Sequence, residues 1–198
     1  EPVLKNDDLD NPDIACNVSP AVMSYHGIQY QSMAPEVMDS AQLAWLQSHL
    51  WILSGLYGCV RPFHAVEPYR LEMGAKLAVD DACDLYAFWD DKLARIIAPA
   101  GSNTTIVNLA SVEYAKAVLP HLAADATVVT CLFGEGVRNG KPIQRSTASK
   151  KARGSMVRWM AENKLEDASG LTAFDVGYRH APELSNKNTL VFLNEQTL

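Results

Sequence analysis

The feature that most constrains the fold is the stretch 53–74, LSGLYGCVRPFHAVEPYRLEMG, where backbone breakers alternate with charged and aromatic side chains. The breakers are Gly55, Gly58, Pro62 and Pro68. Inside a helix a glycine costs about 1 kcal/mol and a proline about 3 kcal/mol, so this stretch cannot belong to a long helix. A buried strand would not carry so many charges. The segment therefore predicts rigid turns that present Arg61, Arg70 and Glu72.

The length and composition are those of a single globular domain. The 198 residues are 48% hydrophobic and 20% charged, and no apolar run reaches the ~20 residues that cross a bilayer. We find no basic-then-apolar leader, and the four cysteines and five histidines lack metal-ligand spacing. We therefore expect a cytoplasmic protein with reduced thiols, no membrane partner, no metal and no cofactor.

The net charge of −6 hides a local concentration of positive charge. Residues 1–40 contain seven acids and one base, which accounts for the whole excess. From residue 138 to residue 158 the chain carries seven bases and no acid: Arg138, Lys141, Arg145, Lys150, Lys151, Arg153 and Arg158. A local basic surface can attract an anionic partner whatever the mean charge. A nucleic-acid partner therefore stays open despite the acidic total.

Hydrophobic periodicity predicts interleaved helices and strands. Apolar residues at three- to four-residue spacing indicate helices over 39–52, 84–98, 111–120 and 148–165. Apolar or β-branched runs indicate strands or extended pieces over 52–58, 68–74, 104–111, 126–133, 141–149, 171–180 and 188–195. Asn139-Gly140 predicts a hairpin between two of these strands. We expect a mixed α/β (α+β) fold: one compact domain over 16–198 with a mixed sheet, a β-hairpin and flanking helices, preceded by an acidic arm or connector at 1–15.

The basic helix is the first candidate for chemistry. Its cations Lys150, Lys151 and Arg153 lie near the helix start, where the helix dipole favours acids. An anionic partner such as a phosphate would explain this placement, and Gly154 would allow it a close approach. The alternative is a solvated helical face.

The second candidate is the pair of arginines in the opening stretch. Arg61 precedes Pro62 and is therefore biased to extended geometry. Guanidinium groups held on rigid turns suit bidentate binding of phosphate or carboxylate. The alternative is an internal network that pairs Arg61 or Arg70 with Glu67 or Glu72.

The third candidate is the NLASVEY segment at a strand-to-helix junction. Ser111 is a candidate nucleophile, but no base is visible beside it and there is no GxSxG pattern. Helix capping is therefore the favoured role for Ser111. The aspartates between residues 80 and 91 could coordinate a hard cation, but capping and solvation of a helix explain them better.

Five blocks in this order, LSGLYGCVRP, PYRLEMG, DLYAFW, NLASVEY and KKARG, resemble the signatures of the YaaA family of peroxide stress proteins. The resemblance runs from about Asn17 to Phe192. It implies a compact mixed α/β protein of the bacterial cytosol that limits peroxide damage by keeping unincorporated iron low. It also implies DNA binding through a helix-hairpin-helix-like element and a basic cleft.

Carried over by residue, the resemblance implies three groups of site residues. They are Arg61, Tyr69, Arg70 and Glu72; Asn108, Ser111 and Tyr114; and Lys150, Lys151 and Arg153. The best match to the small-residue hairpin is the turn that contains Ser54, Gly55, Tyr57 and Gly58. The family's opening apolar strand and its Ser-Pro-Ala-Lys-like segment have no counterpart, so we expect this chain to lack the family's N-terminal strand region.

These residues and the resemblance together suggest two alternative functions, one as a binding protein and one as an enzyme. The first is a monomeric stress-response protein that binds double-stranded DNA, or another phosphate-bearing ligand, without sequence preference and limits iron-linked damage. Its phosphate contacts would be Arg61, Arg70, Lys150, Lys151, Arg153 and Arg158. The second is an enzyme for a small anionic or nucleotide-like substrate in the same cleft. Its catalytic candidates are Glu72, Ser111 and Tyr114.

Overall fold

Four β-strands rich in apolar residues form the main sheet. The computed structural model describes residues 18–197, so the predicted acidic arm at 1–15 lies outside the described residues. The strands are β5 (Thr105–Asn108), β6 (Thr127–Gly134), β9 (Tyr178–His180) and β10 (Thr189–Asn194), in the order β5-β6-β10-β9. β6 pairs in parallel with β5 and β10, and β9 is antiparallel to β10. The mixed α/β class predicted from the sequence is confirmed.

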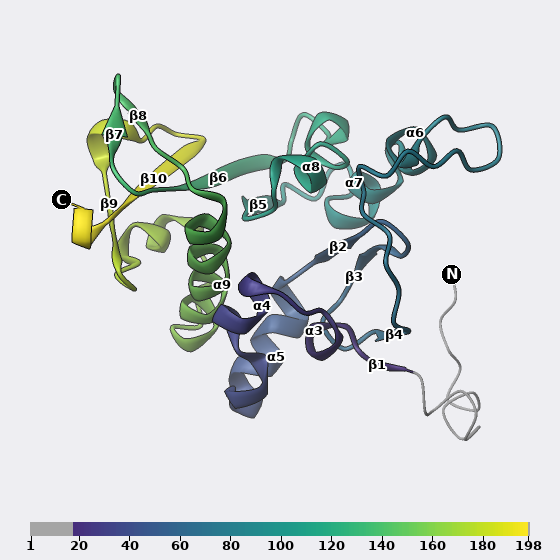
Figure 1. Cartoon of the computed structure of the whole chain (residues 1–198), viewed down its shortest axis with the longest axis horizontal. Helices are drawn as coiled ribbons and strands as arrows, with labels where there is room; N and C mark the ends of the chain where they lie inside the picture. Colours follow the sequence, from purple (N-terminus) through teal and green to yellow (C-terminus); the bar gives the residue numbers. More distant parts are fainter. Residues whose placement is uncertain (1–17, 198) are drawn as a thin grey trace.

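Helix α9 (Ser146–Glu162) packs against this sheet (Figure 1). Its buried Ala152 and Met156 join a core that includes Phe133 and Phe192 of the sheet. The two phenylalanine rings stack with centroids 5.5 Å apart. The α9 side chains Val157 and Ala161 belong instead to a second core, formed with the N-terminal helices. Helix α9 therefore joins two cores.

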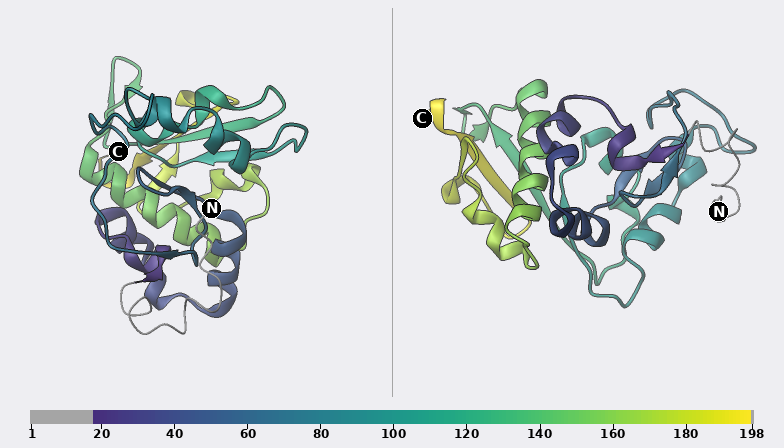
Figure 2. Two further views of the ribbon diagram at one scale, coloured as in Figure 1. Left: turned by 90° about the vertical axis from the view of Figure 1, so that its right-hand side faces the viewer. Right: turned by 90° about the horizontal axis from the view of Figure 1, so that it is seen from below.

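The N-terminal helices form the second of these two cores together with α9. They are α3 (Ala21–Ser24), α4 (Ile28–Met33) and α5 (Ser40–His49). Asp39 caps α5 in a capping box with Gln42. The helix therefore begins next to residue 39, where the sequence predicts its start. Figure 2 shows the sheet and α9 toward one end of the molecule, with α4 between them and the strands β2 (Ile52–Ser54), β3 (Gly58–Val60) and β4 (Ala65–Val66).

Short strands and helices complete the other end. β2 (Ile52–Ser54) and β3 (Gly58–Val60) form an antiparallel hairpin, and β1 (Ser19–Pro20) pairs with β4 (Ala65–Val66). The short helices are α6 (Leu85–Trp89), α7 (Lys92–Ile97) and α8 (Val112–Ala115). The 3₁₀ turns are Pro35–Val37, Leu119–His121, Ala168–Ala173, Pro182–Leu184 and Glu195–Thr197.

Several predicted elements differ in the structure. The single helix predicted over 84–98 is two helices, because Asp90 takes a left-handed backbone with φ 44°. The helix predicted over 111–120 ends at Ala115 and continues only as a 3₁₀ turn. Residues 68–74 form no strand, since their backbone packs against a glycine turn described below.

The Asn-Gly hairpin is confirmed, although it is shorter than predicted. β7 (Val137–Arg138) pairs with β8 (Lys141–Pro142) through Asn139 and Gly140, with φ 51° and 70°. Positive φ at both central residues is the geometry that Asn-Gly favours. The predicted long strand 141–149 is wrong, because α9 already begins at Ser146.

Gly154 sets how closely α9 and α4 approach. A Cβ at this position would lie 2.0 Å from the carbonyl oxygen of Gln29 in α4. Helix propensity alone predicts that Gly154→Ala stabilises α9 by about 1 kcal/mol. We expect the opposite sign, a loss of about 1–3 kcal/mol, because backbone atoms must move apart. Urea unfolding followed by circular dichroism measures this. Ser155→Ala in the same helix is the control, and a more stable Gly154→Ala variant would contradict the prediction.

Candidate functional site

Exposed cations gather on the β7–β8 hairpin and the start of α9. They are Arg138, Lys141, Arg145, Lys150 and Lys151, called here the basic segment. Within residues 18–197, none of them forms an ion pair with a carboxylate. The first turn of α9 contains no acid, and its N-cap makes no side-chain hydrogen bond. The unsatisfied amide groups of this turn add to the positive potential.

The other two predicted cations of α9 have different surroundings. Arg158 donates to Glu162 over 2.7 Å, one turn along the exposed side of the helix. Arg153 is partly buried on the opposite side, between Ser149, Met156 and Val157, which are all buried. Its Nε is fully buried and has no hydrogen-bond partner within the described chain. Burial lowers the pKa of Arg153 from its ordinary value.

Arg61 stabilises the end of α5. Its Nη1 donates to the carbonyl oxygens of Ser48 and Leu50 over 3.1 and 3.3 Å. Its guanidinium lies 3.7 Å from the centroid of the Trp51 ring. Arg70 is exposed. Neither arginine forms an ion pair with Glu67 or Glu72 in the part of the chain that the structure describes, so the alternative, an internal ion-pair network, is not what fixes the opening stretch.

Close backbone packing fixes that stretch instead. A Cβ on Gly55 would lie 2.6 Å from the carbonyl oxygen of Leu71, so the turn can touch the 71–72 backbone only with glycine. The Gly55 carbonyl accepts a hydrogen bond from Trp89 Nε1 over 3.1 Å. Gly58 has φ 73°, and a Cβ there would lie 2.7 Å from Leu93 and Trp89 side-chain atoms. The glycines are therefore explained by packing.

Hydroxyl groups from distant parts of the sequence meet beside this turn. Buried Ser54 has its Oγ 2.6 Å from Tyr69 Oη, which lies 2.9 Å from Tyr25 Oη. Tyr57 packs edge-on against Tyr69, and its hydroxyl accepts from the Glu67 amide over 3.0 Å. We call Ser54, Tyr25 and Tyr69 the hydroxyl cluster. Tyr25 was missed from the sequence because it lies between two short helices, where no periodicity marks it.

The α8 region contributes Tyr114 to the same surroundings. Burial and the nearby hydroxyl of Tyr69 raise the pKa of Tyr114, and the carboxylates of Glu113 and Glu72 raise it further. Burial likewise raises the pKa of Tyr30, with Tyr69 and Tyr114 adding to the shift. These phenols are therefore neutral near pH 7. Of the three catalytic candidates, Glu72 and Tyr114 lie close enough to interact.

Ser111 and Asn108 have local structural contacts. Ser111 Oγ accepts from the Tyr114 amide over 3.4 Å and caps α8, as favoured from the sequence. Asn108 donates to Thr130 Oγ1 over 3.2 Å and accepts from the Ala110 amide over 3.1 Å. Together these bonds fix the junction between β5 and α8.

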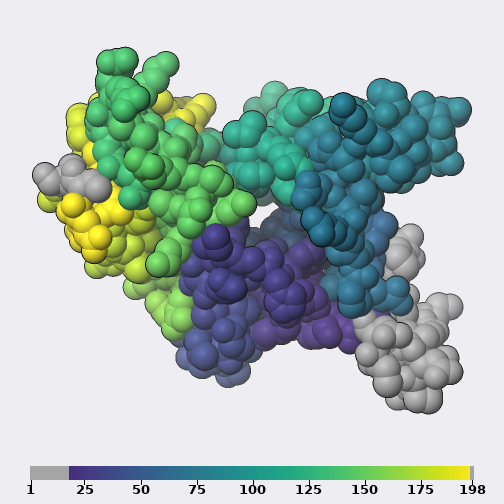
Figure 3. All heavy atoms as spheres, viewed as in Figure 1, coloured from purple at the N-terminus to yellow at the C-terminus, as the bar shows by residue number. Residues whose placement is uncertain are grey.

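A hollow opens at the centre of the molecule (Figure 3). Its edges are the purple atoms of the α4 region, the green atoms of α9, the teal atoms around α8 and the blue atoms around residues 55–75. These segments carry Tyr25 and Tyr30, Arg153, Tyr114 and Tyr69, respectively. We call this feature the central hollow. Tyr30 stacks on Tyr25 and interacts with Tyr69 and Tyr114, so these four phenols lie near one another.

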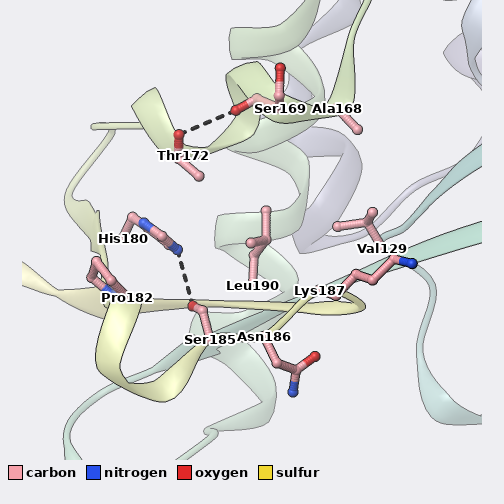
Figure 4. Close-up of a pocket in the computed structure, with 10 residues that line it drawn as sticks. All are labelled: Val129, Ala168, Ser169, Thr172, His180, Pro182, Ser185, Asn186, Lys187 and Leu190. Carbon is pink, nitrogen blue, oxygen red and sulfur yellow. Dashed lines mark hydrogen bonds between the residues drawn. The ribbon is translucent and has the colours of Figure 1, made fainter.

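A second concavity of about 410 Å³ lies beside the sheet, away from the predicted site residues (Figure 4). Its lining is mostly apolar, with His180, Ser185 and Lys187 among its polar residues. Ser185 Oγ donates to the Ala181 carbonyl over 2.8 Å, accepts from the Val191 amide over 2.9 Å and contacts His180 Nε2 at 3.0 Å. These bonds use all of the hydroxyl's capacity, so the Ser–His pair holds the β9–β10 connection.

Within the described residues, three further observations bear on chemistry. No three His, Cys, Asp or Glu side chains there lie close enough together to hold a metal ion. None of the helices there has the length and apolar character needed to cross a membrane. The thiols of Cys59, Cys83 and Cys131 are free, and burial raises the pKa of Cys59 to about 11 and that of Cys131 to about 12.

The fold and these surfaces define a mixed α/β protein with an exposed basic segment and a separate polar hollow. A family model described as "Peroxide stress protein YaaA" matches residues 2–184. The resemblance inferred from the five blocks is confirmed, and the chain belongs to the YaaA family of peroxide stress proteins.

Three relatives show the extent of the similarity. A UPF0246 protein of Pediococcus pentosaceus is 44% identical over 194 residues, which cover 98% of this chain and 76% of the relative. UPF0246 proteins of Desulfitobacterium hafniense and Lachnoclostridium phytofermentans are 43% and 45% identical over 182 residues each. These matches cover 91% of this chain and 71% and 70% of those relatives.

The contacts of Arg61 predict a structural effect that Arg70 does not share. Arg61→Met removes two hydrogen bonds to the end of α5 and the contact with Trp51, so we expect a loss of about 1–3 kcal/mol. Arg70→Met, at an exposed position without an ion pair in the described chain, should change stability by less than about 0.5 kcal/mol. Urea unfolding compares the two. Equal losses of unfolding free energy in the two variants would show that the contacts of Arg61 with the end of α5 contribute nothing to stability.

Proposed function

We propose that this protein acts in the peroxide response by binding the phosphate backbone of double-stranded DNA through the basic segment, without reading the base sequence. The carrying observation is the basic segment itself: its five cations between residues 138 and 151 are exposed, no acid lies between them, and none of them forms an ion pair with a carboxylate within the described residues. Contacts of lysine and arginine with phosphate supply affinity that is independent of sequence. We further propose that the protein acts as a cytoplasmic monomer.

The six predicted phosphate contacts are not equivalent in this proposal. Lys150 and Lys151 are exposed and carry it, and Arg70 is an exposed additional candidate. Arg158 and Arg61 could reach a phosphate only by giving up the contacts with Glu162 and with the end of α5. Arg153 is partly buried and its Nε is fully buried, so we leave it out of the phosphate contacts.

The cations of the basic segment should control DNA affinity and its salt dependence. We expect Arg145→Ala/Lys150→Ala/Lys151→Ala to weaken binding of labelled duplex DNA and to reduce the log–log salt slope by about 2.7, since each contact contributes about 0.9. Fluorescence anisotropy at several salt concentrations measures both. The matched control, Lys76→Ala/Lys116→Ala/Lys187→Ala, removes the same charge from other exposed positions. Equal weakening by both triple variants, or an absence of binding by the wild type, would contradict the proposal.

Binding along the backbone also offers a route to protection from iron-linked damage. Protein cations release the counterions condensed on DNA phosphates. Ferrous ions are drawn to DNA in the same way, so coated DNA would hold fewer of them where peroxide is converted to hydroxyl radical. We expect wild-type protein to reduce nicking of plasmid DNA by Fe²⁺ and hydrogen peroxide more than the Arg145/Lys150/Lys151 variant does. Equal protection by both proteins at equal concentration would count against this route.

A further inference from the structure

The β7–β8 hairpin stands out from the rest of the molecule. Figure 1 shows its tip projecting beyond the main sheet, and Figure 3 shows the same region as a green protrusion at the upper left. All residues from Val137 to Lys141 are exposed. Within residues 18–197, the side chains of Arg138 and Lys141 form no ion pair and no hydrogen bond. The hairpin therefore presents two cations that the rest of the described chain does not use.

Backbone hydrogen bonds hold this projection together. Below the tip, the Glu135 amide donates to the Ile143 carbonyl over 2.9 Å, and the Ile143 amide donates to the Gly136 carbonyl over 2.8 Å. Asn139 and Gly140 have the positive φ angles of a tight two-residue loop. The two cations are therefore carried on a hydrogen-bonded ribbon, so little backbone entropy is lost when they meet a partner.

The register of the ribbon puts both cations on one face. Arg138 is paired with Lys141 across the two strands, and Val137 is paired with Pro142. Directly opposed residues point to the same face of a ribbon, and successive residues point to opposite faces. One face is therefore cationic and the other apolar, with Val137 48% exposed. The cationic face suits a partner that is negatively charged and grooved.

The hairpin is joined closely to the other cations of the basic segment. Only residues 143–145 separate β8 from α9, so the Cα atoms of Pro142 and Ser146 lie within about 14 Å of each other. Arg145 and Lys150, at the start of α9, are exposed. If these cations contact DNA phosphates, an element that projects beyond them extends into a groove that the phosphates border.

We infer that the hairpin places Arg138 in the minor groove of the bound duplex, with Lys141 beside it on a phosphate. The inference rests on the DNA binding proposed above and adds to it a preference for narrow, A·T-rich grooves. The narrow minor groove of an A-tract concentrates negative potential, which attracts arginine. Arginine suits this position better than lysine, because its guanidinium is more weakly hydrated than an ammonium group.

The composition of the hairpin favours the minor groove over the major groove. An element that reads the major groove typically brings three or four side chains to the base edges. The cationic face of this hairpin has two side chains, and the minor groove, about 6 Å wide, has room for one arginine side chain. A contact there reads little of the base sequence, because A·T and T·A pairs present the same acceptors. It therefore agrees with binding that is governed by the phosphate backbone.

Chemical protection of a bound duplex tests which groove the hairpin enters. Dimethyl sulfate methylates adenine at N3, in the minor groove, and guanine at N7, in the major groove. On a short duplex with an A-tract between G·C pairs, saturating wild-type protein should protect adenine N3 and leave guanine N7 reactive. Arg138→Ala should still bind through Lys150 and Lys151 but lose most of this protection. Protection of guanine N7 instead, or of neither atom, would overturn the inference.

Fluorescence anisotropy with A-tract and G·C duplexes of equal length gives a second measurement. We expect the wild type to bind the A-tract about fivefold more tightly, which is the lower end of what one good base-edge contact discriminates. Arg138→Lys keeps the charge, so the salt slope should stay the same while the preference falls. Arg145→Lys is the matched control outside the hairpin and should keep both. An undiminished preference in Arg138→Lys would overturn the role of Arg138.

The outcomes separate this inference from the proposed function. Binding that depends on Arg145, Lys150 and Lys151 but is equally tight on both duplexes would overturn the role of the hairpin and leave the proposed function standing. An absence of binding to either duplex would overturn both.

Discussion

The contact between α4 and α9 at Gly154 is the constraint on which the rest of the structure depends. The backbone of α4 lies so close to Gly154 that no side chain fits between the two helices. This contact joins the sheet core, which α9 covers with Met156, to the core of the N-terminal helices, which it reaches with Val157. It also brings the backbone of Gln29 and Met33 in α4 against α9 at Gly154.

The hydroxyl cluster is polar and partly buried, so it needs rigid support. A buried hydroxyl without a partner loses the free energy of its hydration, typically about 1–3 kcal/mol. The turn at Gly55 supplies the support, because it fixes the amides that occupy Ser54 and brings the 71–72 backbone into contact. The two glycines of the opening stretch, Gly55 and Gly58, therefore have one explanation: they allow close packing around the turn that holds Ser54 in place.

Features that depend on neighbouring residues were predicted correctly from the sequence. Features that depend on contacts between distant parts of the chain were not. Asn139-Gly140 and the cap at Ser111 depend on residues within a turn of each other, and both were predicted. The break at Asp90 and the role of Arg61 depend on contacts that periodicity does not encode. Tyr25 and Tyr69 are 44 positions apart, so only the fold could reveal their hydrogen bond. The predicted cleft stays a proposal.

Thiol chemistry offers a poor explanation for how the described part of this peroxide stress protein would act. The thiolate is the form of cysteine that attacks peroxide. Burial raises the pKa of Cys59 to about 11, so the thiolate is a minor form of Cys59 near neutral pH. Cys131 is buried and its pKa is higher still. Cys83 is exposed, but within residues 18–197 neither of the other cysteines pairs with it. The proposed anion binding suits these residues better, because the exposed cations of the basic segment favour oxygen-rich ligands.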